Sequence, residues 1–454
     1  MNETIRRNCL LVAQKLKNPQ EVAQIALRDE NIFMEEISPW DPLSLDYGYP
    51  GLIVFFAEMD THVPNEGWRE VYQSLMNDLE TIVKEIEPTD FSLFGGFTGV
   101  CFATQLIAQK DPSYSKLDDI YRFKLMQYLE GEFLSLIESE EEIGRTLLPS
   151  EHDAIEGLPC FVFYLLAYQD NSDVRELLER MLYQLVRVAK DISVENCKIP
   201  GWYVNLHDSR IRQAVPKHIV EDLLKNYPNG FFETGLAHGI SGCLAALAKA
   251  LSCQVEVEGQ REAMYKIIRW LQQSQEEVEG LGNLWTKRLG LNLKNPNFVE
   301  VRSTDYFDGW AHGAPGILNS LLLAACALKD HALVKECKEG LFKMMQRIRN
   351  HHTSRGLPFC YGLAGVLTIV HNAGVLLGNE SLLESAREIS EIILKESREE
   401  AAFGFKSIAP SNRYEEILLI DNPGLLTGSA GITLSLLFSI SKRQPRWLSI
   451  FLLN

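Results

Sequence analysis

Two kinds of helical pattern alternate along the chain. Runs that are apolar on nearly every side follow short glycine-containing steps, and the stretches between them place apolar residues three and four positions apart. A helix of the first kind must be buried, whereas one with a single apolar stripe covers a core and turns a charged face to solvent. The amphipathic stretches are 66–87, 117–137, 173–190, 260–273, 332–348 and 381–396. The alternation predicts two concentric layers of helices.

Each apolar run follows a step of the form G-x-x-G or a close variant of it. The seven steps begin at Gly48, Gly96, Gly157, Gly239, Gly313, Gly362 and Gly428. A tight turn into a buried helix needs a positive φ or a close backbone approach, and glycine permits both. The spacing is too irregular for an open solenoid with one fixed repeat. We therefore expect a mainly α protein, an α/α toroid with seven inner helices that start at these glycines and about seven outer helices.

Two stretches break the helical pattern. Between 191 and 234 the chain combines prolines, aromatics and short apolar segments, which is typical of strands or irregular structure. We predict a small inserted lobe at 168–234, between a first part of the toroid at 1–167 and a second part at 235–454 that carries the main motifs. Residues 281–304 are a second irregular excursion, and little strand is expected outside the lobe.

Length, charge and cysteine content exclude several classes of protein. With 454 residues, the chain exceeds the size at which one hydrophobic core usually stops growing. The net charge of −17 repels phosphate, so nucleic acid is excluded as a partner and a basic peptide is favoured. No apolar stretch approaches the ~18 residues of a transmembrane helix, and the N-terminus has no signal-peptide pattern. Nine scattered cysteines form no disulfide framework, which favours a cytoplasmic protein, with membrane association only through a complex.

Titratable side chains stand beside four of the glycine steps. Asp153, His238, His312 and Cys360 each lie one to four residues before the first glycine of a step. Because the steps are equivalent, we expect the four side chains to line one central cavity, at the end of the ring where helix N-termini point their free N–H groups. Such an end suits anions, thiolates or enolates. A single histidine there would be an ordinary core residue, but four such groups favour a site.

The ordered motifs resemble those of the lanthionine synthetase C family, the LanC lantibiotic cyclases. The matching segments are DAIEGL at 153–158, GLAHGISG at 235–242, GWAHGAPGI at 309–317, FCYGLAG at 359–365 and NPGLLTGSAGI at 422–432. The resemblance extends from the first glycine step to the last. It implies an α/α toroid with a small inserted lobe, and a Zn²⁺ at its centre.

The resemblance also implies a reaction. LanC proteins close thioether rings by adding a cysteine of a precursor peptide to a dehydroalanine or dehydrobutyrine that a separate dehydratase has made. The implied partners are therefore the precursor peptide (leader and core), the dehydratase and a transporter of the modification complex. A free thiol with a pKa of about 8.5 is only slightly ionised at neutral pH, and a bound Zn²⁺ holds the sulfur as thiolate. An acid must then protonate the enolate that the addition creates.

Carried over position by position, the resemblance makes His238 the catalytic acid/base, Asp153 the catalytic acidic residue of the family's D-x-x-x-G-L step, and Cys360 a zinc ligand. The chain departs from the family at two other zinc positions. The family's first zinc cysteine is replaced by Ala311 and its zinc histidine by Tyr361. One interpretation is a rearranged metal site in which His312 joins Cys360, with His238 as a third candidate ligand, since zinc accepts mixed cysteine and histidine ligands. The other is a metal-free member in which a histidine ionises the thiol.

Three functions compete on these residues. The first is a lanthionine-forming peptide cyclase, with Trp310, Tyr361 and Asp308 as walls of the substrate pocket. The second is a non-catalytic or metal-free LanC-like subunit that binds the precursor peptide and supports a modification complex. The third, an α/α-toroid glycosidase, needs two facing carboxylates such as Asp153 and Asp308. The family motifs disfavour this third function.

Overall fold

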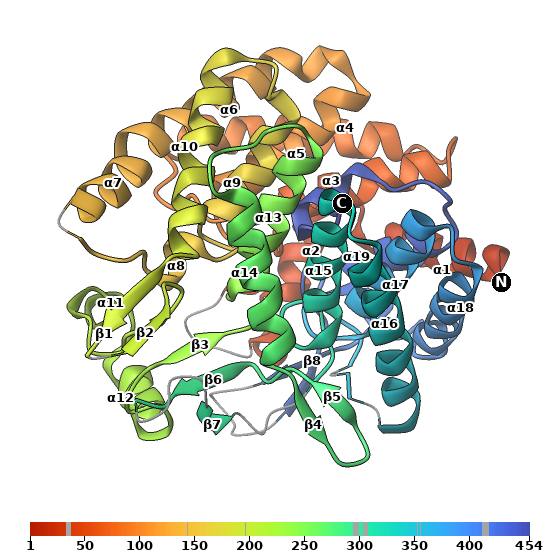
Figure 1. Cartoon of the computed structure of the whole chain (residues 1–454). Helices are drawn as coiled ribbons and strands as arrows, with labels where there is room; N and C mark the ends of the chain where they lie inside the picture. Colours follow the sequence, from red (N-terminus) through yellow and green to blue (C-terminus); the bar gives the residue numbers. More distant parts are fainter. Residues whose placement is uncertain are drawn as a thin grey trace. The chain divides into compact units, whose positions relative to one another are not determined.

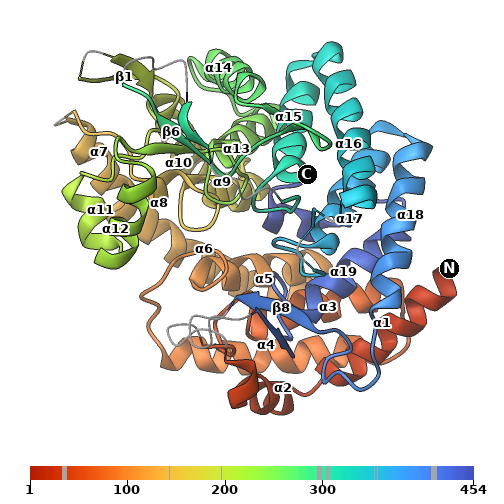
Figure 2. The same ribbon diagram turned by 90° about the horizontal axis from the view of Figure 1, so that it is seen from below.

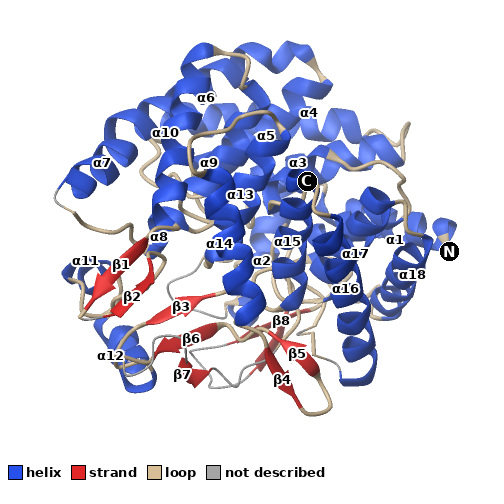
Figure 3. Ribbon diagram, viewed as in Figure 1, coloured by secondary structure: helices blue, strands red, loops and turns tan. Residues whose placement is uncertain are grey.

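The computed structural model describes residues 1–32, 38–142, 144–195, 197–293, 299–302, 307–351, 353–354, 356–410 and 417–454. Helices dominate the described chain (Figure 3). The chain forms two compact units, and unit 1 is built from both ends of the sequence, Met1–Met126 and Ser354–Phe451. Unit 2 contains Gln127–Thr353 and the last three residues, Leu452–Asn454. No helix in the described ranges is long and apolar enough to cross a membrane.

All seven apolar runs are helices, and the first glycine of each step is the N-cap, which confirms the prediction. Unit 1 contains α3 (Tyr49–His62), α5 (Phe97–Lys110), α17 (Leu363–Leu377) and α19 (Ser429–Ser439); unit 2 contains α9 (Leu158–Leu165), α13 (Ile240–Ser252) and α15 (Ala314–Leu328). Glycine is required most clearly at Gly313, where φ is +86°. A Cβ there would lie 1.9 Å from the carbonyl oxygen of Phe307.

The predicted amphipathic helices form and cover the buried ones. They are α4 (Trp68–Glu85), α6 (Ser115–Tyr128), α10 (Ser172–Val188), α14 (Gln260–Gln273), α16 (His331–His351) and α18 (Glu380–Lys395). In unit 1, α4 packs on α3 and α18 packs on α17. In unit 2, α10, α14 and α16 pack on α9, α13 and α15 respectively. Each apolar helix of these pairs is thus followed in sequence by the helix that covers it.

The buried helices also pack on one another within each unit. In unit 1, α3 contacts α5 and α19, and α19 contacts α17 and the N-terminal helix α1 (Asn2–Leu16). In unit 2, α13 lies between α9 and α15, as Figures 1 and 2 show. Within each unit, helices that follow neighbouring glycine steps pack against each other, so the steps themselves lie side by side.

Short antiparallel strand pairs lie outside the predicted lobe as well as inside it. They are β1 (Asp191–Val194) with β2 (Cys197–Pro200), β4 (Glu276–Val278) with β5 (Gly282–Leu284), and β8 (Ser407–Pro410) with β9 (Ile417–Ile420). A three-stranded sheet has the order β3 (Phe231–Glu233), β6 (Arg288–Leu291), β7 (Val299–Arg302). The described strands outside 168–234 contain only three or four residues each, which agrees with the expectation of little strand there. The sequence did not place them one by one, because strands this short show no clear periodicity. Within the excursion at 281–304, residues 294–298 and 303–304 lie outside the described ranges.

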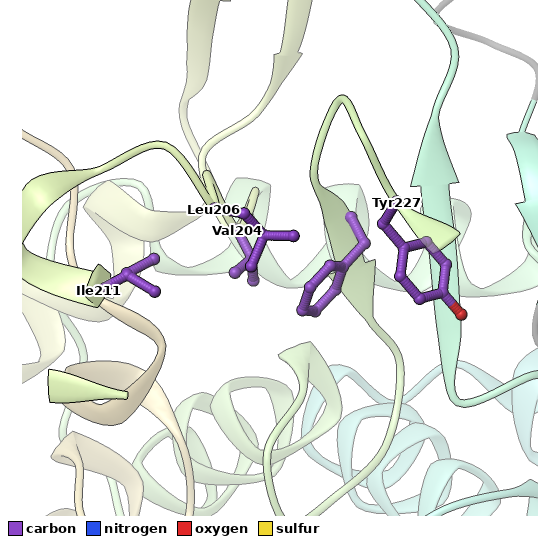
Figure 4. Packing of buried hydrophobic residues seen from close by; sticks show 5 residues of the cluster. Val204, Leu206, Ile211 and Tyr227 are labelled. Atoms are coloured by element: carbon purple, nitrogen blue, oxygen red, sulfur yellow. The ribbon is translucent and has the colours of Figure 1, made fainter. Parts of the chain in front are cut away.

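Part of the predicted lobe has a hydrophobic cluster of its own. The cluster joins Val204, Leu206, Ile211, Tyr227 and Phe231, the first four of which are labelled in Figure 4. These residues lie just before and on α11 (Ser209–Ala214), and after α12 (Lys217–Asn226) up to the start of β3. Helix α10, by contrast, packs on α9 and α14 as a covering helix. The domain boundaries placed after residues 167 and 234 stay a prediction.

Candidate functional site

Backbone hydrogen bonds connect the turns that precede the glycine helices of unit 2. The amide of Ala154 donates to the carbonyl of Ala237 at 2.8 Å, and the amide of Ala237 donates to the carbonyl of Ala311 at 3.2 Å. The third, fourth and fifth steps are therefore adjacent at one end of their helices. This placement brings the side chains beside these three steps onto a common face.

The turns of unit 1 are connected in the same way. Leu45 donates to Phe94 at 2.8 Å, Leu425 donates to Asp46 at 3.0 Å, and Cys360 donates to Leu426 at 3.0 Å, in each case from backbone N–H to backbone carbonyl. The sixth step thus adjoins the seventh, the seventh adjoins the first, and the first adjoins the second. Within unit 1 these four steps also share one end of their helices.

The best-defined group of site residues in unit 2 is the pair of Asp153 and His238. Asp153 follows the short helix α8 (Pro149–His152), and its Oδ1 accepts the backbone N–H groups of Ile155 and Glu156 at 2.9 and 2.8 Å. Its other oxygen, Oδ2, lies 2.9 Å from Nδ1 of His238. The carboxylate side chain is 7% exposed, whereas the imidazole is 48% exposed. A buried, firmly held carboxylate therefore orients a histidine that solvent can reach.

This pairing sets the protonation state of His238. Burial by itself lowers the pKa of His238, but the hydrogen bond and the negative charge of Asp153 outweigh it, so the pKa lies above its usual value. The contact to Asp153 assigns the proton to Nδ1 in the neutral ring. Nε2 is then the basic nitrogen of the neutral form. Such a histidine can accept and return a proton close to neutral pH.

His312 lies beside this pair. Its ring centroid is 6.0 Å from that of His238, and the ring of Phe307 meets it edge-on at 5.9 Å. His312 is 9% exposed. Gly235 passes so close that a Cβ there would lie 2.7 Å from Nδ1 of His312. The structure therefore brings together three of the four predicted site residues, namely Asp153, His238 and His312.

Two residues predicted as pocket walls are buried in unit 2. Trp310 is 0% exposed, and the carboxylate of Asp308 forms a two-pronged ion pair with Arg347 at 2.9 and 2.7 Å. Thr353 Oγ1 donates a further hydrogen bond of 2.5 Å to Asp308. These contacts give Asp308 a structural role in holding the segment that carries His312. Its part in a substrate pocket stays a prediction.

Cys360 and Tyr361 belong to unit 1. Cys360 is half-buried and is held through its backbone N–H by Leu426. Tyr361 donates its hydroxyl to the carbonyl of Ile408 at 2.7 Å, and burial raises the pKa of its phenol. The prediction that Cys360 shares one cavity with the histidines stays a prediction.

Sequence reasoning missed a polar cluster at the first and seventh steps. Asp46 and Tyr47 occupy the two positions before Gly48, and Thr427 occupies the position before Gly428. Thr427 Oγ1 lies 2.8 Å from Oδ2 of Asp46 and 3.2 Å from the hydroxyl of Tyr47. The signal was present, since these are the same offsets from the glycine that singled out Cys360 and His312.

The residues at the family's zinc positions do not fit a zinc ion. Ala311 has no donor atom, and Tyr361 keeps a protonated hydroxyl that is already engaged as a hydrogen-bond donor. Among the residues that the structure describes, no group of three or more His, Cys, Asp or Glu side chains is placed to hold a metal ion. Zinc sites in proteins usually use at least three such ligands. The chemistry of this site is therefore derived below from its own side chains.

Comparison with known proteins identifies the family. Residues 39–452 match the family described as "Lanthionine synthetase C-like protein". The nisin biosynthesis protein NisC of Lactococcus lactis subsp. lactis is 26% identical over 370 residues, which cover 80% of this chain and 82% of that protein. The solved structure of a nisin cyclase superposes with a TM-score of 0.72 at 21% identity, covering 90% of this chain and 92% of that one. The fold is accordingly an α/α toroid, and the chain belongs to the lanthionine synthetase C-like family.

Proposed function

We propose that this protein is a lanthionine-forming peptide cyclase, which adds cysteine thiols of a precursor peptide to dehydroalanine or dehydrobutyrine. The observation that carries the proposal is the Asp153–His238 pair, a buried carboxylate that orients a solvent-accessible imidazole at a glycine step. Membership of the family and the likeness to the nisin biosynthesis protein NisC and to a solved nisin cyclase structure support it. The role implies a dehydratase and a peptide transporter as partners, and a cytoplasmic location where these meet.

The pair can perform both proton transfers of the addition. Nε2 of neutral His238 takes the proton of the peptide thiol while the sulfur forms a bond to the β-carbon of the dehydro residue. The electrons of the carbon–carbon double bond move to the α-carbon and its carbonyl, which gives an enolate. The imidazolium then returns the proton to the α-carbon, so the ring closes with no net loss of atoms. Asp153 keeps the ring oriented and stabilises its positive charge between the two transfers.

His312 is placed to contact the same substrate. Its ring lies 6.0 Å from that of His238, and the ring of Phe307 packs against it edge-on. A histidine 6.0 Å from the proton-transferring ring is close enough to contact a substrate that lies against that ring. We assign it to substrate positioning, because the buried ring of His312 is more enclosed than that of His238.

The non-catalytic alternative is less well supported. A subunit that only binds the peptide has no need of a carboxylate-oriented histidine with a raised pKa. The glycosidase alternative has even less support, because Asp308 is committed to Arg347 and is not available as a second acid or base.

The test measures ring closure on the dehydrated precursor. The purified chain is incubated with that peptide, and the remaining thiols are alkylated and counted by mass spectrometry. His238→Ala should slow closure by about 10²–10⁴-fold, the usual contribution of general acid–base catalysis. The matched control is His207→Ala, which removes an exposed histidine of the same unit that contacts the Pro228 carbonyl. Equal rates for wild type and His238→Ala would favour the non-catalytic role.

Metal analysis of the same preparation separates the two interpretations of the zinc positions. We expect little or no tightly bound zinc, because Ala311 and Tyr361 supply no ligand. Stoichiometric zinc that is lost in His312→Ala, with an unchanged circular dichroism spectrum, would establish the rearranged site instead.

A further inference from the structure

A buried carboxylate joins the first and last glycine steps. Asp46 is 5% exposed, and its Oδ1 accepts the backbone N–H groups of Leu426 at 2.7 Å and Thr427 at 3.1 Å. Its Oδ2 accepts the hydroxyl of Thr427 at 2.8 Å. All three donors come from a turn 380 or 381 positions further along the chain. The carboxylate thus determines where this turn lies.

The local sequence is built for this approach. Ser44 Oγ accepts the backbone N–H groups of Asp46 and Tyr47 at 3.1 and 2.9 Å, which fixes the turn that presents the carboxylate. On the other side, Gly424 passes so close that a Cβ there would lie 2.3 Å from Oδ1 of Asp46. Only a glycine at position 424 lets the turn reach the carboxylate.

The same turn that Asp46 holds also binds the backbone of Cys360. The peptide unit between Leu426 and Thr427 donates its N–H to Asp46 and accepts the N–H of Cys360 at its carbonyl, at 3.0 Å. One rigid peptide plane therefore connects the carboxylate to the cysteine. The pKa of Tyr361 is raised mainly by burial and, to a smaller extent, by the negative charges of Cys360 and Asp46. These two groups therefore lie within electrostatic range of Tyr361.

We infer that Asp46 is a positioning residue for the Cys360 thiol, acting through the Leu426–Thr427 peptide unit. The two oxygens of this side chain together accept three hydrogen bonds from the turn, so one residue fixes the peptide unit that holds Cys360. Burial raises the pKa of Asp46 to about 6. The inference concerns the thiol itself and does not depend on the peptide-cyclising reaction proposed above.

The test reads the reactivity of Cys360 in the full-length chain. Folded protein is alkylated with iodoacetamide between about pH 7 and about pH 9, and the peptide that contains Cys360 is quantified by mass spectrometry. In Asp46→Ala the turn loses the acceptor of its hydrogen bonds and opens more often. We expect the labelling rate of Cys360 at the high-pH plateau to rise about tenfold, which is the effect of losing a hydrogen bond to a charged group. Asp46→Asn retains a carbonyl oxygen for both amides and should stay within about twofold of wild type.

A milder pair of variants keeps the test decisive if Asp46→Ala does not fold. Thr427→Val removes one donor to Asp46, and we expect about threefold faster labelling of Cys360. Its control is Thr433→Val, which removes a hydroxyl bond of the same 2.8 Å length, to Ser429 within α19, and should change nothing. The buried thiols of Cys9 and Cys101 report general loosening of unit 1. The inference fails if Cys360 labelling in Thr427→Val equals that in Thr433→Val, or if Cys9 and Cys101 accelerate as much as Cys360.

Discussion

The ion pair between Asp308 and Arg347 offers a sharp test of how unit 2 holds its site. Both side chains are almost fully buried, at 3% and 4% exposure. Replacing Arg347 with Met leaves the Asp308 carboxylate with Thr353 as its remaining side-chain donor among the described contacts. Breaking a buried pair by removing one partner typically costs about 3–5 kcal/mol, because the other charge stays buried without compensation. We expect Arg347→Met to lower the free energy of unfolding by this amount.

A second ion pair of the same unit provides the control. Arg180 binds Glu138 with the same two-pronged geometry, at 3.0 and 2.9 Å, but the two side chains are 35% and 39% exposed. An exposed pair contributes about 0–1 kcal/mol, so Arg180→Met should be nearly neutral. Equilibrium urea denaturation, followed by circular dichroism and by tryptophan fluorescence, measures both variants against wild type.

A double variant isolates the charge. Asp308→Asn combined with Arg347→Met removes both charges, and its loss of stability should be smaller than that of Arg347→Met alone. If Arg347→Met costs no more than Arg180→Met, the buried pair does not anchor this segment. Asp308 would then be available for the substrate role that its position beside the fifth step suggested.

Three further predictions follow from contacts described above. Gly313→Ala should destabilise the chain by more than about 2 kcal/mol, because alanine disfavours the positive φ there and its Cβ would clash with the Phe307 carbonyl. Gly131→Ala is the control in the same urea assay: it has open space around it and should be neutral or slightly stabilising. Asp153→Asn should lower the pKa of His238, measured as an acid shift in the NMR titration of its ring protons; an unchanged titration would contradict the pairing. Burial raises the pKa of Asp46 from 3.8 to about 6, so its ionisation should reduce stability by roughly 3 kcal/mol as pH rises from about 4 to about 6. That slope should flatten in Asp46→Asn, and an equal slope in both proteins would refute the raised pKa.

The helical layers could be predicted because the two sequence patterns that define them, apolar runs after glycines and amphipathic periodicity, are local. Seven apolar runs after seven glycines define the buried helices, and the 3.6-residue period defines the helices that cover them. The strand pairs outside 168–234 were not placed individually, because a strand such as β4 contains only three residues and its partner is recognised only once the chain is folded. An apolar run does not fix the burial of each of its residues: Cys326 lies in the last turn of α15 and is exposed.

The part of the site that could be predicted consists of residues that stand just before equivalent glycine steps. Asp153 and His238 are 85 residues apart, and only their placement within four residues before a glycine step indicated that they would meet. Asp308 could not be interpreted in this way, because its partner Arg347 lies within a stretch whose charges were all expected to face solvent. Asp46 stands at the same offset before its glycine as Cys360, but its hydrogen-bond partners could not be predicted because they lie 380 or 381 positions further along the chain.

The split of unit 1 between the two ends of the chain sets the order in which the protein can fold during synthesis. Gln127–Thr353 leaves the ribosome as nearly all of unit 2, while Met1–Met126 must wait for the segment that ends at Phe451. At roughly 5–20 residues per second, that wait lasts on the order of 15–65 s. During it, the apolar faces of α1 and α3 that pack on α19 have no partner. The N-terminal segment is therefore the part of the nascent chain that we expect to need a chaperone.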